Sequence, residues 1–272
     1  MRRAGRRAVR SFARARLLAG LAALAPQPAT AQEPCRQALA LALDVSGSVD
    51  AREYRLQLDG LAAAFEDPQV QAAFFAMPGA PVRLMVYEWS ALSHQRPVIA
   101  WQDITDPETL AGVAERLRAT RPAAVPNPST AIGAAMIFGA QELLAQAACW
   151  QRTLDISGDG PANIGRHPRD VPEEMTAGIT INGLVIGPDG PANTTKNRAN
   201  LKSLLGYYEA YVLRGPGAFV ETAGSFEDFE AAMRRKLIRE LQPVNISRLA
   251  PVLDPGGGMA RGPAPHPARS DQ

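Results

Sequence analysis

The sequence contains little of the side-chain chemistry on which most enzymes depend, with three histidines and two cysteines among 272 residues. Only His94 and His167 lie in the part expected to fold, and neither neighbours a nucleophile motif. Ser46 lacks the glycines two positions before and after it that a nucleophile elbow requires. Asp44 lacks the aspartate two positions later that is expected in phosphatases of the haloacid-dehalogenase type. We therefore do not expect a catalytic site.

The sequence also lacks a long apolar run at its amino end. The run Leu17–Ala25 is too short for a permanent membrane helix. It follows seven arginines and no acids and precedes Ala29-Thr30-Ala31, so residues 1–31 are predicted to be a secretory signal peptide. No cysteine stands at the cleavage point, which argues against a lipoprotein anchor. We expect an exported protein, periplasmic or extracellular, with no membrane segment after cleavage.

An excess of basic charge is missing once the signal peptide is removed. The whole chain has 29 basic and 27 acidic residues, a formal charge of +2. Removing seven signal-peptide arginines leaves 22 against 27, or −5, which argues against a nucleic-acid partner. Residues 248–272 are rich in Pro, Gly and Ala and are predicted to be a disordered tail. Residues 32–247 are enough for one well-packed domain.

Strand-like and helix-like segments alternate along this domain. The pattern predicts a doubly wound α/β fold with a mostly parallel central sheet, one antiparallel edge strand and helices on both faces. The expected strands are the run that ends at Asp44, then Val82–Trp89, Arg96–Trp101, Arg152–Ile156, Thr180–Ile186 and Ala218–Thr222. The expected helices run from Asp50 to near Asp67, then over Glu108–Ala119, Ala131–Ala147, Val171–Ala177, Thr195–Tyr207 and Phe226–Leu241.

Oxygen-bearing side chains follow the first strand at alternate positions, in Asp44-Val-Ser46-Gly-Ser48. The carboxyl ends of parallel strands are where open α/β sheets bind ligands. One carboxylate and two hydroxyls form part of a shell for a hard divalent cation, which prefers oxygen. Thr130 precedes a helix and Asp159-Gly160 follows a later strand, so both are expected at the same edge. Each motif taken alone is also typical of a helix cap or a turn.

Taken together, these motifs resemble a von Willebrand factor A-type domain over residues 36–242. The resemblance is closest to a family of secreted bacterial proteins with an A-type domain and no assigned biochemical role. The segments that carry this closer resemblance are Asp155-Ile-Ser-Gly-Asp-Gly160 and Arg214-Gly-Pro-Gly-Ala-Phe-Val220. It implies a metal-ion-dependent adhesion site that binds Mg²⁺ or Mn²⁺, some ligands acting directly and some through water. The implied ligands are Asp44, Ser46, Ser48, Thr130 and Asp159.

The ligand chemistry favours a binding role for this site. Mg²⁺ prefers six oxygen ligands and keeps some water. A site with this few protein ligands therefore leaves a coordination position open. Neutral hydroxyls offset little of its charge, which favours an acidic side chain supplied by a protein partner. We therefore expect an exported, metal-dependent protein-binding module. A metal-dependent hydrolase or phosphatase, and a fold whose metal is purely structural, are the alternatives.

The A-type resemblance makes the strands that precede Asp44 and Asp159 parallel neighbours. Cys35 lies nine residues before Asp44, and Cys149 lies ten before Asp159. The two cysteines are then expected at nearly the same height, offset by about one residue rise of 3.3 Å. Because export provides an oxidising compartment, we predict a Cys35–Cys149 disulfide, with two buried thiols as the alternative.

Other polar and aromatic residues receive plainer interpretations. Asp155 lies inside a strand and is expected to support the site or the core rather than to bind the metal. Tyr207 and Tyr208 are expected to pack at a helix end, and Trp89 in the core or at the sheet edge.

Overall fold

A computed structural model describes residues 34–124, 128–188 and 194–242. Within these ranges the protein forms a six-stranded sheet in the order β3-β2-β1-β4-β5-β6. All neighbouring strands are parallel except β2 and β3. The predicted fold class is therefore confirmed. The predicted signal peptide and tail lie outside the described residues.

The strands and helices agree with most of the expected segments. The strands are β1 (Cys35–Asp44), β2 (Val82–Trp89), β3 (Gln95–Ile104), β4 (Cys149–Gly158), β5 (Thr180–Ile186) and β6 (Val220–Ala223). The α-helices are α1 (Ala51–Glu66), α2 (Pro68–Phe74), α3 (Pro107–Ala119), α4 (Ile132–Leu144), α5 (Thr195–Tyr211) and α6 (Phe229–Glu240). Three 3₁₀ turns are η1 (Pro168–Asp170), η2 (Glu173–Thr176) and η3 (Phe226–Asp228).

Two segments differ from the expectation. The single helix expected over Val171–Ala177 is instead the turn η2, which is preceded by Pro172 and soon followed by Gly178 at a φ of 71°. Helix α2 was not predicted, because Asp67-Pro68 was interpreted only as the end of α1. Asp67 also starts α2, since its carboxylate accepts the backbone N–H of Gln69 at 2.8 Å and Pro68 occupies the first turn.

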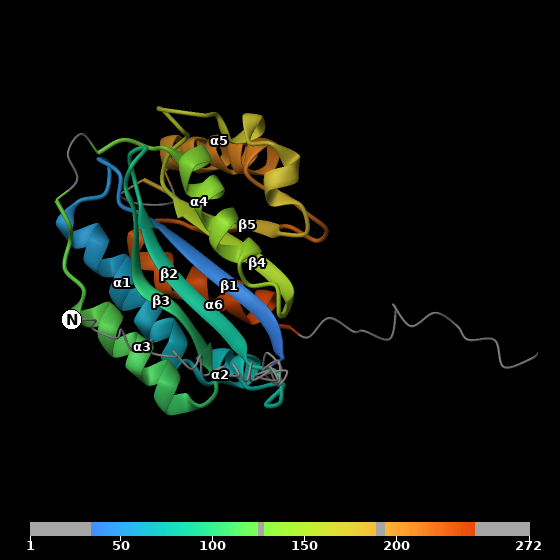
Figure 1. The fold of residues 1–272 in the computed structure, drawn as a ribbon. Coiled ribbons are helices and arrows are strands. Elements are labelled where there is room, and N and C mark those ends of the chain that lie inside the picture. Colours follow the sequence, from blue (N-terminus) through green and yellow to red (C-terminus); the bar gives the residue numbers. More distant parts are fainter. Residues whose placement is uncertain (1–33, 125–127, 189–193, 243–272) are drawn as a thin grey trace, which may run out of the picture. The chain divides into compact units, whose positions relative to one another are not determined.

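Strand β1 separates the two layers of the core. Leu39, Leu41 and Leu43 belong to the cluster that α1, α3 and α6 cover, whereas the intervening alanines face α4 and α5. Figure 1 shows these two groups of helices on opposite sides of the sheet. The alanines of β1 and Gly139 of α4 allow α4 to pack close to the sheet. A Cβ at Gly139 would lie 2.6 Å from the Tyr87 hydroxyl of β2. This alternation explains why β1 is buried along its whole length.

The predicted disulfide is confirmed. Cys35 and Cys149 are bonded, and they are directly paired in the register of β1 with β4. The expected offset of one residue is therefore absent at the cysteines. A one-residue offset is found instead at the opposite edge, between Asp44 and Asp159. Ala42 pairs with Ile156, and the same register brings Asp44 level with Gly158. Asp159 follows one residue later, in the turn after β4.

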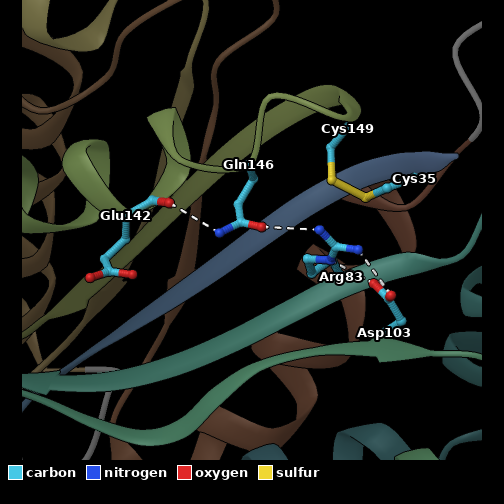
Figure 2. Close-up of a disulfide and its surroundings, with 6 residues drawn as sticks. All are labelled: Cys35, Arg83, Asp103, Glu142, Gln146 and Cys149. Atoms are coloured by element: carbon cyan, nitrogen blue, oxygen red, sulfur yellow. Dashed lines mark hydrogen bonds and ion pairs between the residues drawn. A yellow bond between two sulfur atoms is a disulfide. The ribbon is translucent and has the colours of Figure 1, made fainter. Parts of the chain in front are cut away.

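A polar network lies beside the disulfide at the amino edge of the sheet (Figure 2). Arg83 of β2 forms a two-pronged ion pair with Asp103 of β3, at 2.7 and 3.0 Å. Its remaining nitrogen donates to Gln146 Oε1 at 3.2 Å, and the main-chain oxygen of Gln146 accepts the N–H of Cys149. The network therefore joins β2, β3 and the turn after α4 next to the covalent link between β1 and β4.

A second group of buried charges lies between the sheet and α6. Lys236 Nζ lies 3.0 Å from Asp155 Oδ1, and Lys236 also pairs with Glu240. All three side chains are at most 1% exposed. Burial raises the pKa of Asp155 to about 7, with Lys236 opposing the rise and Glu240 adding to it. Asp155 is thus an acid of the core, paired with a lysine.

We expect replacement of both cysteines by serine to lower the free energy of unfolding by about 4–5 kcal/mol. The link closes a loop with a sequence separation of 114, which gives this value in the chain-entropy description. Urea unfolding of the oxidised parent and the double variant measures the difference. Mass spectrometry without reductant checks the link itself, and two alkylatable thiols in the parent would contradict it.

Asp155 should make stability depend on pH. The folded protein holds this proton up to about pH 7, whereas the usual pKa is 3.8, so the folded state binds more protons between these values. The free energy of unfolding should therefore fall as the pH rises from about 4 to about 7. Asp155→Asn should remove this contribution, measured as the difference from the parent in urea unfolding at each pH. Asp170→Asn, at a half-exposed surface carboxylate, is the control, and identical slopes for parent and Asp155→Asn would contradict the expectation.

Candidate metal centre

Asp44 ends β1 and is fully buried. Its Oδ1 accepts the backbone N–H of Ser46 at 2.7 Å, which folds the chain back immediately after the strand. Gln57 of α1 donates to the main-chain oxygen of Asp44 at 2.9 Å. Asp50 then caps α1 by accepting the N–H groups of residues 52 and 53 at 2.7 and 2.8 Å. The loop between β1 and α1 is thus fixed at both ends.

Ser48 connects this loop to the turn after β4. The Oγ atoms of Ser46 and Ser48 lie 3.3 Å apart, and Ser48 Oγ donates to Asp159 Oδ1 at 2.8 Å. A Cβ at Gly47 would lie 3.0 Å from the carbonyl oxygen of Pro128, so a glycine allows the loop before α4 to approach. Three loops from distant parts of the sequence therefore meet at this point.

Thr130 stands on the third loop and is held by Asn163. The backbone N–H of Thr130 donates to Asn163 Oδ1 at 2.8 Å, and Asn163 Nδ2 donates to Thr130 Oγ1 at 3.4 Å. The threonine does not cap α4, whose N-cap residue is Ala131. Asn163 was missed as a functional residue, although the sequence shows it in a Gly-Pro-Ala-Asn turn after the fourth strand.

The predicted ligands form two levels at the carboxyl edge of β1 and β4. The outer level lines a hollow of about 420 Å³ and includes Ser48, Thr130 and Asp159. Asp44 and Ser46 form the inner level, since they are 0% and 1% exposed. The order of the strands reverses between β1 and β4, so the hollow lies where open α/β sheets bind ligands.

The two carboxylates of the site lie in an environment that disfavours their charge. Burial raises the pKa of Asp44 to about 8, and the neighbouring Asp159 adds to the rise. Burial also raises the pKa of Asp159. A divalent cation between them would offset both effects.

The donors that this edge presents suit one class of cation. The residues described contain no cluster of three or more His, Cys, Asp or Glu side chains. A site here must therefore use hydroxyl oxygens beside two carboxylates, a set that fits a hard cation such as Mg²⁺ or Mn²⁺ rather than a softer metal.

A family model described as "Protein of unknown function (DUF1194)" matches residues 34–245. The chain belongs to this family. A search of curated proteins gave no significant match. No helix in the described ranges of this DUF1194 member has the length and apolar character needed to cross a membrane.

Solved structures show the same fold at low sequence identity. The proximal thread matrix protein 1 of mussel byssus is 14% identical, with a TM-score of 0.50 over 75% of this chain and 48% of its own. The pilus adhesin SpaC of Lactobacillus rhamnosus GG is 12% identical, with a TM-score of 0.52 over 77% of this chain and 31% of its own. A von Willebrand factor type A protein from Catenulispora acidiphila is 14% identical, with a TM-score of 0.49, and the match covers 76% of this chain and 43% of that one.

The A-type resemblance inferred from the sequence is therefore confirmed for the fold. The chain spans less than half the length of each of these solved structures. Another structure of the mussel protein is described as having a zinc-occupied MIDAS motif, with a TM-score of 0.49.

If this edge binds Mg²⁺ as the sequence predicts, Asn163→Ala should weaken that binding about 10-fold, because residues that orient metal ligands typically contribute 10–100-fold to affinity. The substitution removes both side-chain contacts to Thr130 and leaves all five predicted ligands in place. Isothermal titration calorimetry of parent and variant measures the change. Gln69→Ala, on the exposed face of α2, is the control, and equal affinity of parent and Asn163→Ala would contradict the assignment.

Proposed function

We propose that this protein is an exported, divalent-metal-dependent protein-binding module. The observation that carries the proposal is the hollow at the carboxyl edge, where Ser48, Thr130 and Asp159 from three separate loops face one space. These residues, with Asp44 and Ser46 beneath them, would hold Mg²⁺ or Mn²⁺. When bound, the cation would supply a positive centre that attracts an oxygen ligand from a partner.

The residues of the outer level would determine what the site binds. Ser48 and Thr130 are neutral, and Asp159 is the single acid among the described residues that line the hollow. A cation held there would keep much of its charge uncompensated. An acidic side chain on a protein partner is the complementary ligand, and the hollow is open enough to admit it.

Binding fits these residues better than hydrolysis. Neither His94 nor His167 is among the described residues that line the hollow, so no histidine stands ready to act as a base there. The pilus adhesin with the same fold is an adhesion protein, and we extend that role to this chain by analogy. The Cys35–Cys149 disulfide supports export to an oxidising compartment.

Metal binding is tested with Asp44→Ala. We expect Mg²⁺ to bind the parent and not the variant in isothermal titration calorimetry, because the buried carboxylate that attracts the cation is gone. Asp170→Asn is the control at a surface carboxylate, and circular dichroism checks that each variant is folded. Unchanged binding in Asp44→Ala would contradict the proposed ligand set.

The binding role is tested separately, by capturing partners from an extract of the native organism with the mature domain. We expect a protein that is retained in Mg²⁺ and lost in EDTA or with Asp44→Ala. A partner retained in all three conditions would remove the metal from the function. If EDTA changes only the melting temperature, the metal is structural.

A further inference from the structure

Three buried polar atoms, one of them on Asp44 and two near it, have no hydrogen-bond partner among the described residues. They are Asp44 Oδ2, the hydroxyl of Tyr208 on α5 and the indole N–H of Trp89 at the end of β2. All three side chains are fully buried. Because unpaired buried polar groups reduce stability, three of them in one place point to a shared role.

The Tyr208 hydroxyl and Asp44 Oδ2 meet at Gly158, the last residue of β4, and the ring of Trp89 lies beside them. A Cβ at Gly158 would lie 2.5 Å from the Tyr208 hydroxyl, 3.0 Å from Asp44 Oδ2 and 3.5 Å from Cζ2 of the Trp89 ring. The hydroxyl and the carboxylate oxygen, at 2.5 and 3.0 Å from one point, are therefore at most about 5.5 Å apart. A single water molecule spans such a distance.

Tyr208 packs at a defined position on the sheet. Its ring lies against Gly183 of β5, where a Cβ would come within 2.7 Å of the Tyr208 Cδ1 atom. Glycines on two adjacent strands thus make room for the ring and its hydroxyl. A phenylalanine would fill the same apolar space, so packing alone does not account for the hydroxyl.

We propose that Tyr208, together with Trp89, positions the Asp44 carboxylate through one buried water. The carboxylate accepts and the tyrosine hydroxyl can both donate and accept, so one water can link them. The indole N–H of Trp89, which can only donate, belongs to the same buried cluster as Tyr208 and is the third group that such a water would serve. Asp44 Oδ1 is held by the N–H of Ser46, so support at Oδ2 fixes the second oxygen and thereby the orientation of the carboxylate.

This inference rests on the proposed metal site and assigns it a positioning residue. Tyr208 is not among the described residues that line the hollow, so it would not itself be a ligand. It acts on the metal only through the carboxylate that it orients. Removing its hydroxyl should therefore weaken metal binding and leave every ligand in place.

The test compares Tyr208→Phe with Tyr207→Phe. The matched control loses a neighbouring hydroxyl that contacts His167 and the N–H of Ala162. We expect Tyr208→Phe to weaken Mg²⁺ and Mn²⁺ binding 10-fold or more in calorimetry, and to change the electron paramagnetic resonance spectrum of bound Mn²⁺. Tyr207→Phe should match the parent in both. The metal-free melting temperatures show whether either variant merely alters packing.

Equal affinity of Tyr208→Phe and the parent would overturn the inference and leave the proposed function intact. A parent that binds no metal would instead contradict the proposed function. If the parent binds no metal, a double-mutant cycle with Tyr208→Phe and Asp44→Asn in metal-free protein tests whether the two side chains interact. We expect their effects on the free energy of unfolding to be non-additive, whereas additive effects would overturn the link.

Discussion

The parallel pairing of β1 with β4 is the constraint on which the rest of this structure depends. A disulfide ties the two strands at the amino edge, and their register brings Asp44 level with Gly158 at the other edge. The chain leaves the two strands on opposite sides, so the loops that follow them meet over a crevice. The candidate ligands from β1 and from β4 can face one another only because this register is kept. The network around Arg83 supports the same register from the side of β2 and β3 (Figure 2).

Two buried aspartates on these central strands show why a cation is expected at one edge. Asp155 is fully buried, and the structure compensates it with Lys236. Asp44 is equally buried, and burial and the neighbouring Asp159 raise its pKa to about 8. The backbone N–H of Ser46 donates to Asp44 Oδ1, and Gln57 donates to the main-chain oxygen of Asp44. The fold supplies a lysine for the buried carboxylate of Asp155 but a cluster of oxygen atoms beside that of Asp44. This difference is consistent with a metal ion, from outside the chain, that would balance the charge of Asp44.

The sequence was sufficient for the parts of the molecule that depend on local pattern. The buried strand before Asp44, the start of α1 at Asp50 and each ligand motif are properties of short segments. The adjacency of β1 and β4 follows from the A-type resemblance. Asn163, Lys236 and Tyr208 could not be assigned, because their roles depend on contacts with residues more than 30 positions away. Tyr207 and Tyr208 are adjacent on α5, but their hydroxyls have different surroundings, and only the fold separates them. The predicted one-residue offset between the cysteines was wrong for a similar reason. The spacing of residues within each strand does not determine which residues of the two strands pair.

The two levels of the site divide its tasks. The inner level is buried, and in the proposed function it would contribute most to how strongly a cation binds. The outer level stands on loops and carries the hydroxyls and the carboxylate that a partner would meet; Ser48 is exposed, Asp159 is partly exposed and Thr130 is buried. In the proposed function, substitutions in the outer level would therefore change both the ligands of the cation and the surface that a partner meets. Gln57 of α1 contacts the main-chain oxygen of Asp44, and the two proposed positioning residues lie on β2 and α5. In the proposed function, the affinity for a cation would therefore depend on packing across the sheet, whereas the choice of partner would depend on three loops.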